Sequence, residues 1–379
     1  MKYFLVAGEA SGDLHGGNLI KALREADPSA QFAFLGGDCM ASTAGVPPVV
    51  HFKQMAFMGF VAVVRNLNKI SSNEHAARKA ILTFRPDKII LIDYPGFNLR
   101  LARWAKENFP SAETLYYISP KLWAWKSYRI RAVRRYVDRM FTIFPFETEW
   151  YARRGYQVNY VGNPTVDSVA SFRASLHIDD TPAAAGIEQP LPRAGHRPVV
   201  ALLPGSRMQE ITRCLPRMAA LAPLFPDCRF VVAAAPAIDR NVYNRLVGDR
   251  VEVVSHSTYQ LLSTATAAVV NSGTATLETA LLGVPQLVVY NVIGGVAARA
   301  LKKMFIKTKH VSLVNIIAGH EVVTELIADR FTVKNMQREL RKILTDDAFL
   351  QEIRKNYSKI ADELGGPGTA QRCAKLILS

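Results

Sequence analysis

Short apolar runs alternate with longer segments of helical periodicity along most of the chain. Four runs rich in aromatic and β-branched residues predict strands at residues 3–7, 88–93, 114–118 and 140–143. Apolar residues spaced three or four apart predict helices at residues 18–24, 71–84, 99–108 and 128–136. This alternation predicts a parallel sheet with helices on both of its faces.

The alternation stops at residues 168–198, which are rich in Pro and Ala, and then resumes. Further strands are predicted at residues 199–203, 230–234, 251–254, 268–271 and 286–290, and helices at residues 207–224, 274–282, 295–305 and from 333 onwards, with a break at 365–368. We therefore expect two doubly wound α/β domains facing across a cleft, with ligands at the carboxyl ends of the strands. The expected division is residues 1–168 together with the C-terminal helix (about 355–379), a linker at 169–197, and residues 198–354.

Length and composition agree with two globular domains in a chain of 379 residues, of which 49% are hydrophobic and 21% charged. No apolar run reaches the ~18–20 residues of a membrane span, and Glu9 interrupts the first run before any signal-peptide cleavage site. The four cysteines, Cys39, Cys214, Cys228 and Cys373, are far apart. We therefore expect neither disulfides nor a zinc site, and a cytoplasmic location.

The net charge of +15 favours polyanions as partners: nucleic acid, anionic lipid headgroups or phosphorylated substrates. Basic residues gather at residues 121–139 and 299–309, and a solvated helix face explains either cluster equally well. Trp123 and Trp125 beside the first cluster could stack on bases. However, no helix-turn-helix, RNA-recognition or zinc pattern appears, so nucleic-acid binding is the least favoured interpretation.

The first strand-to-helix loop contains Gly8 but lacks the GxGxxG spacing of a dinucleotide site. Glu9 and Asp13 would repel a pyrophosphate, whereas these carboxylates and the Ser11 hydroxyl suit the hydroxyls of a sugar. A tight turn with a helix N-cap is the alternative. Further on, Asp93 ends an apolar strand, and either a general base or a structural acceptor of backbone amides fits that position.

Two loops in the second half have the composition of anion-binding turns. In LLPGSR, Gly205 and Ser206 let backbone N–H groups approach an anion, and Arg207 adds a fork of charged donors. In SGTATLE, a second turn at a predicted helix N-terminus precedes a carboxylate that could bind a ribose; its residues are Ser272, Gly273, Thr274 and Glu278. Together the two loops predict a nucleotide site.

Several common catalytic motifs are absent from the chain. There is no GxxxxGK[ST] loop and no GxSxG elbow, and Thr324 stands where a zinc-protease motif beginning at His320 would need its second His. No DxD-type carboxylate pair for a divalent ion is present either. We therefore expect a transferase that needs no metal or cofactor, in which Arg207 and helix N-termini neutralise a diphosphate leaving group.

Seven segments together resemble the lipid-A-disaccharide synthase family, and they follow the family's order over most of the chain. The segments are VAGEASGD (6–13), MGF (58–60), IDYPGFN (92–98), SPKLWAW (119–125), LLPGSR (202–207), SGTATLE (272–278) and KTKHVSLVN (307–315). The resemblance implies a GT-B fold and an inverting, metal-independent glycosyltransferase of lipid A biosynthesis in Gram-negative bacteria. The implied reaction joins UDP-2,3-diacylglucosamine to the 6-hydroxyl of 2,3-diacylglucosamine 1-phosphate, giving the β-1,6-linked disaccharide 1-phosphate and UDP.

The resemblance also implies roles for residues. It places Asp93 as the general base, Arg207 on the diphosphate, Glu278 on the uridine ribose and Asn315 in the donor region. The expected acceptor-binding residues are Glu9, Ser11, Asp13, Asn98, Trp123 and Trp125. The chain departs from the family pattern at three positions. Gly96 stands where many members carry a second Asp, Val314 replaces the usual Pro, and Thr324 replaces a Pro or Lys.

Because both implied substrates carry acyl chains and phosphates, we expect peripheral contact with the anionic inner-membrane face. The apolar residues 55–64, followed by Arg65 and Lys69, would dock there together with the basic clusters, although ordinary core is the alternative for 55–64. A homodimer is left open. The alternative function within the same fold is another UDP-sugar enzyme, either an epimerase or a hexosaminyltransferase acting on a different lipid.

Overall fold

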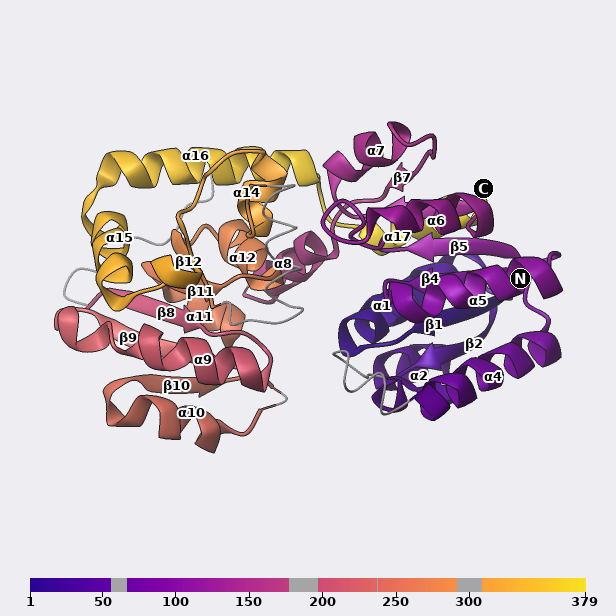
Figure 1. Cartoon of the computed structure of the whole chain (residues 1–379), viewed down its shortest axis with the longest axis horizontal. Coiled ribbons are helices and arrows are strands. Elements are labelled where there is room, and N and C mark those ends of the chain that lie inside the picture. Colours follow the sequence, from indigo (N-terminus) through magenta and orange to yellow (C-terminus); the bar gives the residue numbers. More distant parts are fainter. Residues whose placement is uncertain (56–66, 177–196, 237, 292–308) are drawn as a thin grey trace. The chain divides into compact units, whose positions relative to one another are not determined.

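A computed structural model describes residues 1–55, 67–176, 197–236, 238–291 and 309–379. The chain forms two compact units: Met1–Pro164 with Pro367–Ser379, and Thr165–Gly366 (Figure 1). Three predictions fall wholly or mostly on residues outside these ranges. They are the apolar segment 55–64 with Arg65, the helix at 295–305, and the basic cluster at 299–309.

The N-terminal unit contains a seven-stranded sheet in the order β3-β2-β1-β4-β5-β6-β7, with every pair parallel. Its strands are β1 (Lys2–Ala7), β2 (Gln31–Gly36), β3 (Val50–His51), β4 (Lys88–Ile92), β5 (Glu113–Tyr117), β6 (Arg139–Thr142) and β7 (Asn159–Tyr160). The central strands are buried on both faces, as expected for a parallel sheet covered by helices.

Helices cover both faces of this sheet: α1 (Ala10–Ala26), α2 (Asp38–Ala44), α4 (Leu67–Phe84), α5 (Pro95–Asn108), α6 (Ile130–Tyr136) and α7 (Pro145–Ala152). Alternate residues of β1 enter two different cores. Tyr3 and Leu5 join the core that contains α1 residues, whereas Phe4 and Val6 join the core that contains α4 and α5 residues. The period of two along a strand thus divides its side chains between two apolar layers.

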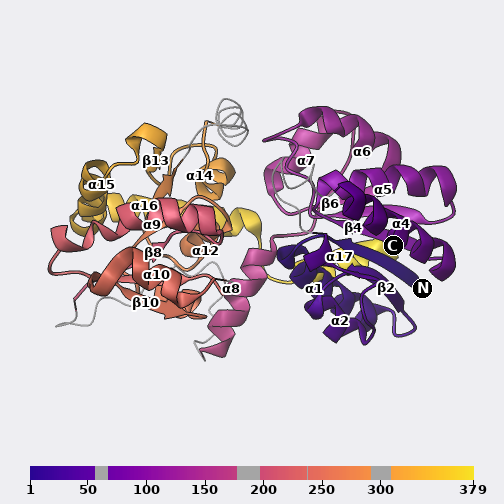
Figure 2. The ribbon, with the colours of Figure 1, turned by 60° about the horizontal axis from the view of Figure 1, so that its bottom comes forward.

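The last helix, α17 (Thr369–Leu378), packs on α1, and Figure 2 shows it in yellow among the indigo elements. Cys373 and Ile377 are fully buried in the same core as Leu5. The Arg139 guanidinium binds Glu113 and also donates to the carbonyls of the last turn of α17. The final helix is therefore an integral part of the N-terminal unit.

The C-terminal unit contains a six-stranded parallel sheet in the order β10-β9-β8-β11-β12-β13. Its strands are β8 (Val199–Leu203), β9 (Arg229–Ala234), β10 (Glu252–Ser255), β11 (Ala267–Asn271), β12 (Gln286–Tyr290) and β13 (Glu325–Ile327). Its helices are α8 (Pro164–Ser175), α9 (Met208–Ala219), α10 (Arg240–Val247), α11 (Thr258–Thr264), α12 (Thr274–Leu281), α14 (Leu313–Ala318), α15 (Val333–Thr345) and α16 (Asp347–Leu364). Both sheets begin with the 3-2-1-4 order of doubly wound folds, so the predicted fold class is confirmed.

Two predicted boundaries differ from the structure. Residues 169–175 belong to helix α8 rather than to the linker, because Val169 is buried against the rest of the protein. Helix α16 stays in the C-terminal unit, where its buried Tyr357 hydroxyl accepts a hydrogen bond from Gln286 of β12. The chain therefore returns to the N-terminal unit at Pro367, not near residue 355.

Candidate active site

The turn between β4 and α5 holds Asp93 in an unusual backbone conformation. Asp93 and Tyr94 have φ values of 42° and 45°, in the left-handed region that non-glycine residues rarely adopt. The Asp93 N–H donates to Tyr117 at 3.1 Å, and its carbonyl accepts from the Asn98 amide at 2.7 Å and from the Tyr116 hydroxyl. These bonds from neighbouring elements stabilise a turn that would otherwise relax, and such strain concentrates at functional sites.

Burial raises the pKa of the Asp93 carboxyl to about 6. The positive charge of Lys121 partly offsets this shift, and the negative charge of Glu9 adds to it. A carboxylate with a pKa near 6 is still mostly ionised at neutral pH and is a stronger base than an exposed aspartate. The raised pKa of Asp93 is therefore compatible with a role in proton abstraction.

The first loop, between β1 and α1, lies against the Asp93 turn. A Cβ atom added to Gly8 would come within 2.3 Å of the Tyr94 ring, so this close approach requires glycine. Glu9 follows directly and accepts a hydrogen bond from the exposed Ser11 hydroxyl at 2.9 Å. Glu9 and Ser11 thus carry polar groups beside Asp93, where an acceptor hydroxyl would have to lie.

Asp13 has a structural role instead of the predicted sugar contact. Its side chain is buried, with 3% exposed, and its oxygens accept from the backbone N–H groups of Gly37 at 2.6 Å, Cys39 at 3.0 Å and Met40 at 3.2 Å. The carboxylate therefore caps the N-terminus of α2 and favours its dipole. The predicted contact of Asp13 with an acceptor sugar is therefore corrected to a helix cap.

Asn98 and Trp123 are also internal. Asn98 is fully buried, and its amide donates to the carbonyls of Ile92 and Asp93. Its side chain therefore stabilises the turn between β4 and α5. Trp123 is 6% exposed and packs edge-on against Phe146. Both predicted acceptor contacts are therefore corrected to supporting roles, whereas the half-buried Trp125 remains a candidate.

The partner of Trp123 is Glu147, a residue that the sequence analysis missed. Its carboxyl accepts from the Trp123 indole at 3.0 Å, from the Ser119 hydroxyl at 2.6 Å and from the N–H of Phe144 at 3.2 Å. Burial raises the pKa of Glu147 to about 7 even though these hydrogen bonds oppose the shift. The signal was present as a Glu three residues after the N-cap of α7, the position of a capping box.

In the C-terminal unit, the turn after β8 carries the predicted diphosphate contacts. Gly205 has φ +112°, and a Cβ there would come within 2.5 Å of the Glu210 carboxylate, so the turn requires glycine. Ser206 is exposed, and Arg207 occupies the N-cap of α9. The Arg207 guanidinium is 63% exposed and lies 3.6 Å from Glu210, which leaves most of its donors open to a ligand.

The turn after β11 brings Gly273 and Thr274, both exposed, to the N-terminus of α12. Ser272 differs, because its N–H donates to Val289 at 3.0 Å and its hydroxyl to Val311 at 2.9 Å. Ser272 therefore ties the turn to the chain entering α14 and has no N–H or O–H left for an anion. The expected contacts at this turn are reduced to Gly273 and Thr274.

Glu278 lies one turn further along α12. Its carboxylate accepts a hydrogen bond from the Tyr259 hydroxyl at 2.9 Å, and burial raises its pKa. Tyr259 is in turn held edge-on by Phe172 at a ring distance of 5.4 Å. Glu278 is thus held in place through Oε1, and no residue in the described ranges donates a hydrogen bond to its Oε2.

Asn315 does not present its side chain to a ligand. It is fully buried, and its amide donates to Val323 at 2.8 Å and Glu325 at 3.0 Å while its oxygen accepts from Val322 at 2.8 Å. Buried Glu325 also accepts from the Ser312 N–H at 2.8 Å. The predicted donor contact at Asn315 is therefore corrected to a buried network that joins α14 to β13.

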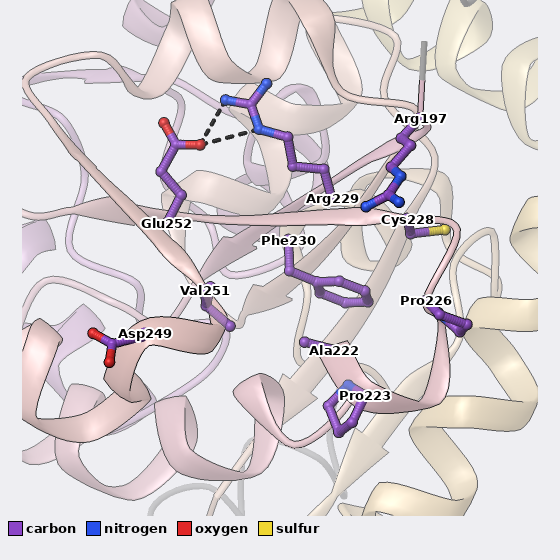
Figure 3. A pocket seen from close by; sticks show the side chains of 10 residues that line it. All are labelled: Arg197, Ala222, Pro223, Pro226, Cys228, Arg229, Phe230, Asp249, Val251 and Glu252. Atoms are coloured by element: carbon purple, nitrogen blue, oxygen red, sulfur yellow. Dashed lines mark hydrogen bonds and ion pairs between the residues drawn. The ribbon is translucent and has the colours of Figure 1, made fainter. Parts of the chain in front are cut away.

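A cavity of about 640 Å³ opens elsewhere on the C-terminal unit (Figure 3). Figure 3 shows Arg229 and Glu252 paired beside it; they are the first residues of β9 and β10. The cavity therefore lies at the amino ends of the strands, opposite the turns that carry Arg207 and Thr274. Among the residues that the structure describes, no group of three or more His, Cys, Asp or Glu side chains is arranged to hold a metal ion.

Solved structures share the fold of this chain, and a family model matches its sequence. A UDP-GlcNAc 2-epimerase from Neisseria meningitidis bound to UDP-GlcNAc has a TM-score of 0.64 over 100% of this chain and 98% of its own, at 15% identity, which establishes a shared fold. Residues 3–377 match the family model described as lipid-A-disaccharide synthetase. The chain belongs to this family. The predicted GT-B fold and the predicted enzyme class, a glycosyltransferase of lipid A biosynthesis, are thereby confirmed.

Two members of the family match this chain over nearly all of their own length. The lipid-A-disaccharide synthase of Geobacter metallireducens is 36% identical over 100% of this chain and 96% of the relative. That of Syntrophus aciditrophicus is 38% identical over 99% of this chain and 96% of the relative. Within the described residues, we find no helix with both the length and the apolar character needed to cross a membrane.

Proposed function

We propose that this synthase joins UDP-2,3-diacylglucosamine to 2,3-diacylglucosamine 1-phosphate, releasing UDP and the β-1,6-linked disaccharide 1-phosphate. The observation that carries the chemistry is the Asp93 carboxyl, which burial poises at a pKa of about 6 in a strained turn at the carboxyl end of a central strand. Family membership over residues 3–377 supports the substrate class.

In the proposed step, the acceptor 6-hydroxyl loses its proton to Asp93 as its oxygen attacks the anomeric carbon of the donor sugar. The bond from that carbon to the β-phosphate oxygen breaks, and UDP leaves with the bonding electrons. Because attack and departure occur on opposite faces, the configuration inverts. The negative charge that grows on the diphosphate is stabilised by Arg207 and by the N-termini of α9 and α12.

The remaining residues bind the two substrates. Gly205, Ser206, Gly273 and Thr274 present backbone N–H groups to the diphosphate, and Glu278 accepts from the ribose hydroxyls. Glu9, Ser11 and Trp125 contact the acceptor sugar beside Asp93. No metal ion is needed in this scheme, so activity should persist in EDTA and should not rise on adding magnesium.

We also propose peripheral binding to an anionic membrane through helix α6, where Arg131, Arg134 and Arg135 are exposed. Each basic residue near such a surface contributes about 1 kcal/mol. Vesicles containing phosphatidylglycerol should bind the protein at low salt and release it at high salt. Replacing the three arginines with Glu should abolish this binding, whereas unchanged binding would contradict the proposal.

The decisive experiment supplies both diacylated substrates to the purified protein and follows UDP release together with the disaccharide mass. Appearance of UDP and disaccharide in equal amounts supports the proposed reaction. UDP release or sugar isomerisation without the acceptor would instead indicate the alternative UDP-sugar enzymes. Asp93→Asn protein serves as the negative control.

A further inference from the structure

Asn271 is the last residue of β11, a strand that lies between β8 and β12 inside the C-terminal sheet. Its side chain is 3% exposed. The amide oxygen accepts a weak hydrogen bond from the Cys214 thiol at 3.7 Å. The amide nitrogen, by contrast, has no hydrogen-bond partner in the described part of the chain. A buried donor without a partner is destabilising, so its retention calls for an explanation.

The unpartnered nitrogen faces the turn that precedes α9. A Cβ built on Gly205 would lie 2.8 Å from the Asn271 nitrogen and 2.5 Å from the Glu210 carboxylate. The amide orientation is consistent with these neighbours, because the thiol can donate to the oxygen, whereas the reversed amide would turn its oxygen towards the Glu210 carboxylate. A side chain at position 205 would therefore collide with the Asn271 amide, and glycine is required there.

Two helices, α9 and α12, begin next to the Asn271 side chain. Ser206 and Arg207 lead from the Gly205 turn into the twelve-residue α9, and Asn271 itself leads through Gly273 into the eight-residue α12. Both helix dipoles and the Arg207 guanidinium favour an anion here. Glu210 opposes an anion, but it already lies 3.6 Å from Arg207, so a diphosphate competes with one carboxylate for a guanidinium that has further donors.

We propose that the Asn271 amide nitrogen donates a hydrogen bond to a phosphate oxygen of the nucleoside diphosphate donor. Asn271 is then a binding residue that contacts the leaving group, in addition to the predicted set. This inference rests on the proposed binding of UDP by the C-terminal unit. It adds that a buried side chain beneath the two loops distinguishes the diphosphate from the nucleoside alone.

The test compares binding of UDP and of uridine by calorimetry, together with thermal unfolding of the unliganded protein. Asn271→Leu keeps the approximate volume and removes the donor, and Asn271→Asp keeps the shape and adds a negative charge. We expect Asn271→Leu to bind UDP about tenfold to hundredfold more weakly, since hydrogen bonds to charged groups are strong, and to bind uridine within twofold of the wild type. Asn271→Asp should bind UDP more weakly still, because its carboxylate repels phosphate.

Unfolding separates a binding role from a structural one. Asn271→Leu removes only the weak contact from the Cys214 thiol and a nitrogen without a partner among the described residues, so the variant should unfold at the same temperature as the wild type or higher. The matched control is Asn356→Leu, which removes a buried asparagine of the same unit whose amide donates to Glu352 at 2.8 Å. That control should unfold at a lower temperature and keep its UDP affinity.

Several outcomes would overturn the inference. UDP affinity within twofold of the wild type in a folded Asn271→Asp protein would do so, even if Asn271→Leu fails to fold. Equal weakening of UDP and uridine with a lower unfolding temperature would show a structural role instead. A wild-type protein that binds neither UDP nor uridine would contradict the proposed function itself, which is a different result from loss of UDP binding in the variants alone.

Discussion

The turns after β4 and β8 both follow the carboxyl ends of interior strands, each in its own sheet, but they are built in opposite ways. At Asp93, two successive non-glycine residues adopt the left-handed region, and side chains of Asn98 and Tyr116 bind the carbonyl of the turn. At Gly205, glycine supplies the positive φ, Arg207 is largely exposed, and the amide nitrogen of Asn271 has no partner among the described residues. The backbone N–H and carbonyl of Asp93 are thus hydrogen-bonded within the protein, whereas the second turn has donors that no described residue accepts from.

This difference follows from what each turn has to hold. A general base needs a fixed position and partial burial to raise its pKa, and both are supplied by the protein itself. A diphosphate site needs positive groups that are not already committed, because the ligand brings the negative charge. The comparison predicts that substitutions at Asp93 change both turnover and the free energy of unfolding. Substitutions in the second turn should mainly change how the protein binds UDP and stabilises the leaving diphosphate.

The largest expected effect comes from Asp93→Asn. This change keeps the shape of the side chain and removes its ability to accept a proton, so turnover should fall by about 10²–10⁴-fold while UDP affinity stays within twofold. Initial rates of UDP release and calorimetric UDP titration measure the two quantities. The exposed Asp329→Asn protein is a control, and near-normal turnover of the Asp93 variant would mean that another group is the base.

Arg207→Ala should have the next largest effect, a fall in turnover of about 10²–10³-fold, because charge on the leaving diphosphate grows in the transition state. UDP binding should weaken as well. Steady-state rates at saturating substrates measure the turnover, and Arg217→Ala on the same helix is the control. Equal turnover of the Arg207 variant and the wild type would contradict the proposal that the turn after β8 stabilises the leaving diphosphate.

The raised pKa of Asp93 predicts that the stability difference between Asp93→Asn and the wild type increases with pH. Burial raises the pKa of Asp93 from its ordinary 3.8 to about 6, so ionisation of this carboxyl destabilises the folded state. Asp93→Asn should therefore be more stable than the wild type by up to about 3 kcal/mol near pH 8. The gain should shrink as the pH falls through 6 and vanish below about 4. Urea unfolding at several pH values measures it, and a constant difference would argue against the raised pKa.

Glu278→Ala should give the smallest effect, a loss of about tenfold in UDP affinity through missing ribose hydrogen bonds. Binding of UDP and of 2′-deoxy-UDP by calorimetry checks it, because the variant should no longer distinguish the two. Tyr259→Phe, which removes the hydroxyl that holds Glu278, should lie between the variant and the wild type. Unaltered discrimination in Glu278→Ala would remove this residue from the ribose site.

Periodicity predicted the central strands well, and the exceptions have physical causes. The predicted helix at residues 18–24 is the second half of α1, which begins at Ala10. Its first half contains Gly12, Gly16 and Gly17 and therefore has low intrinsic helix propensity. A Cβ at Gly16 would come within 2.6 Å of Met40 in α2, so glycine there permits close packing of α1 on α2. Strand β2 was not predicted, although it pairs with both β1 and β3 near one edge of the sheet.

The sequence by itself determined the two parallel-sheet domains, the strand-to-helix turns and the family, because hydrophobic period and local turn residues are properties of short segments. Only the tertiary structure decided which polar motif residues are available to a ligand. Asp13 caps a helix 24 residues further along the chain, Asn315 binds Glu325, and Trp123 binds Glu147, whereas Asn271 is left without a partner for its nitrogen. A polar residue's partners come from distant segments, so its role is set by the folded chain and not by its motif.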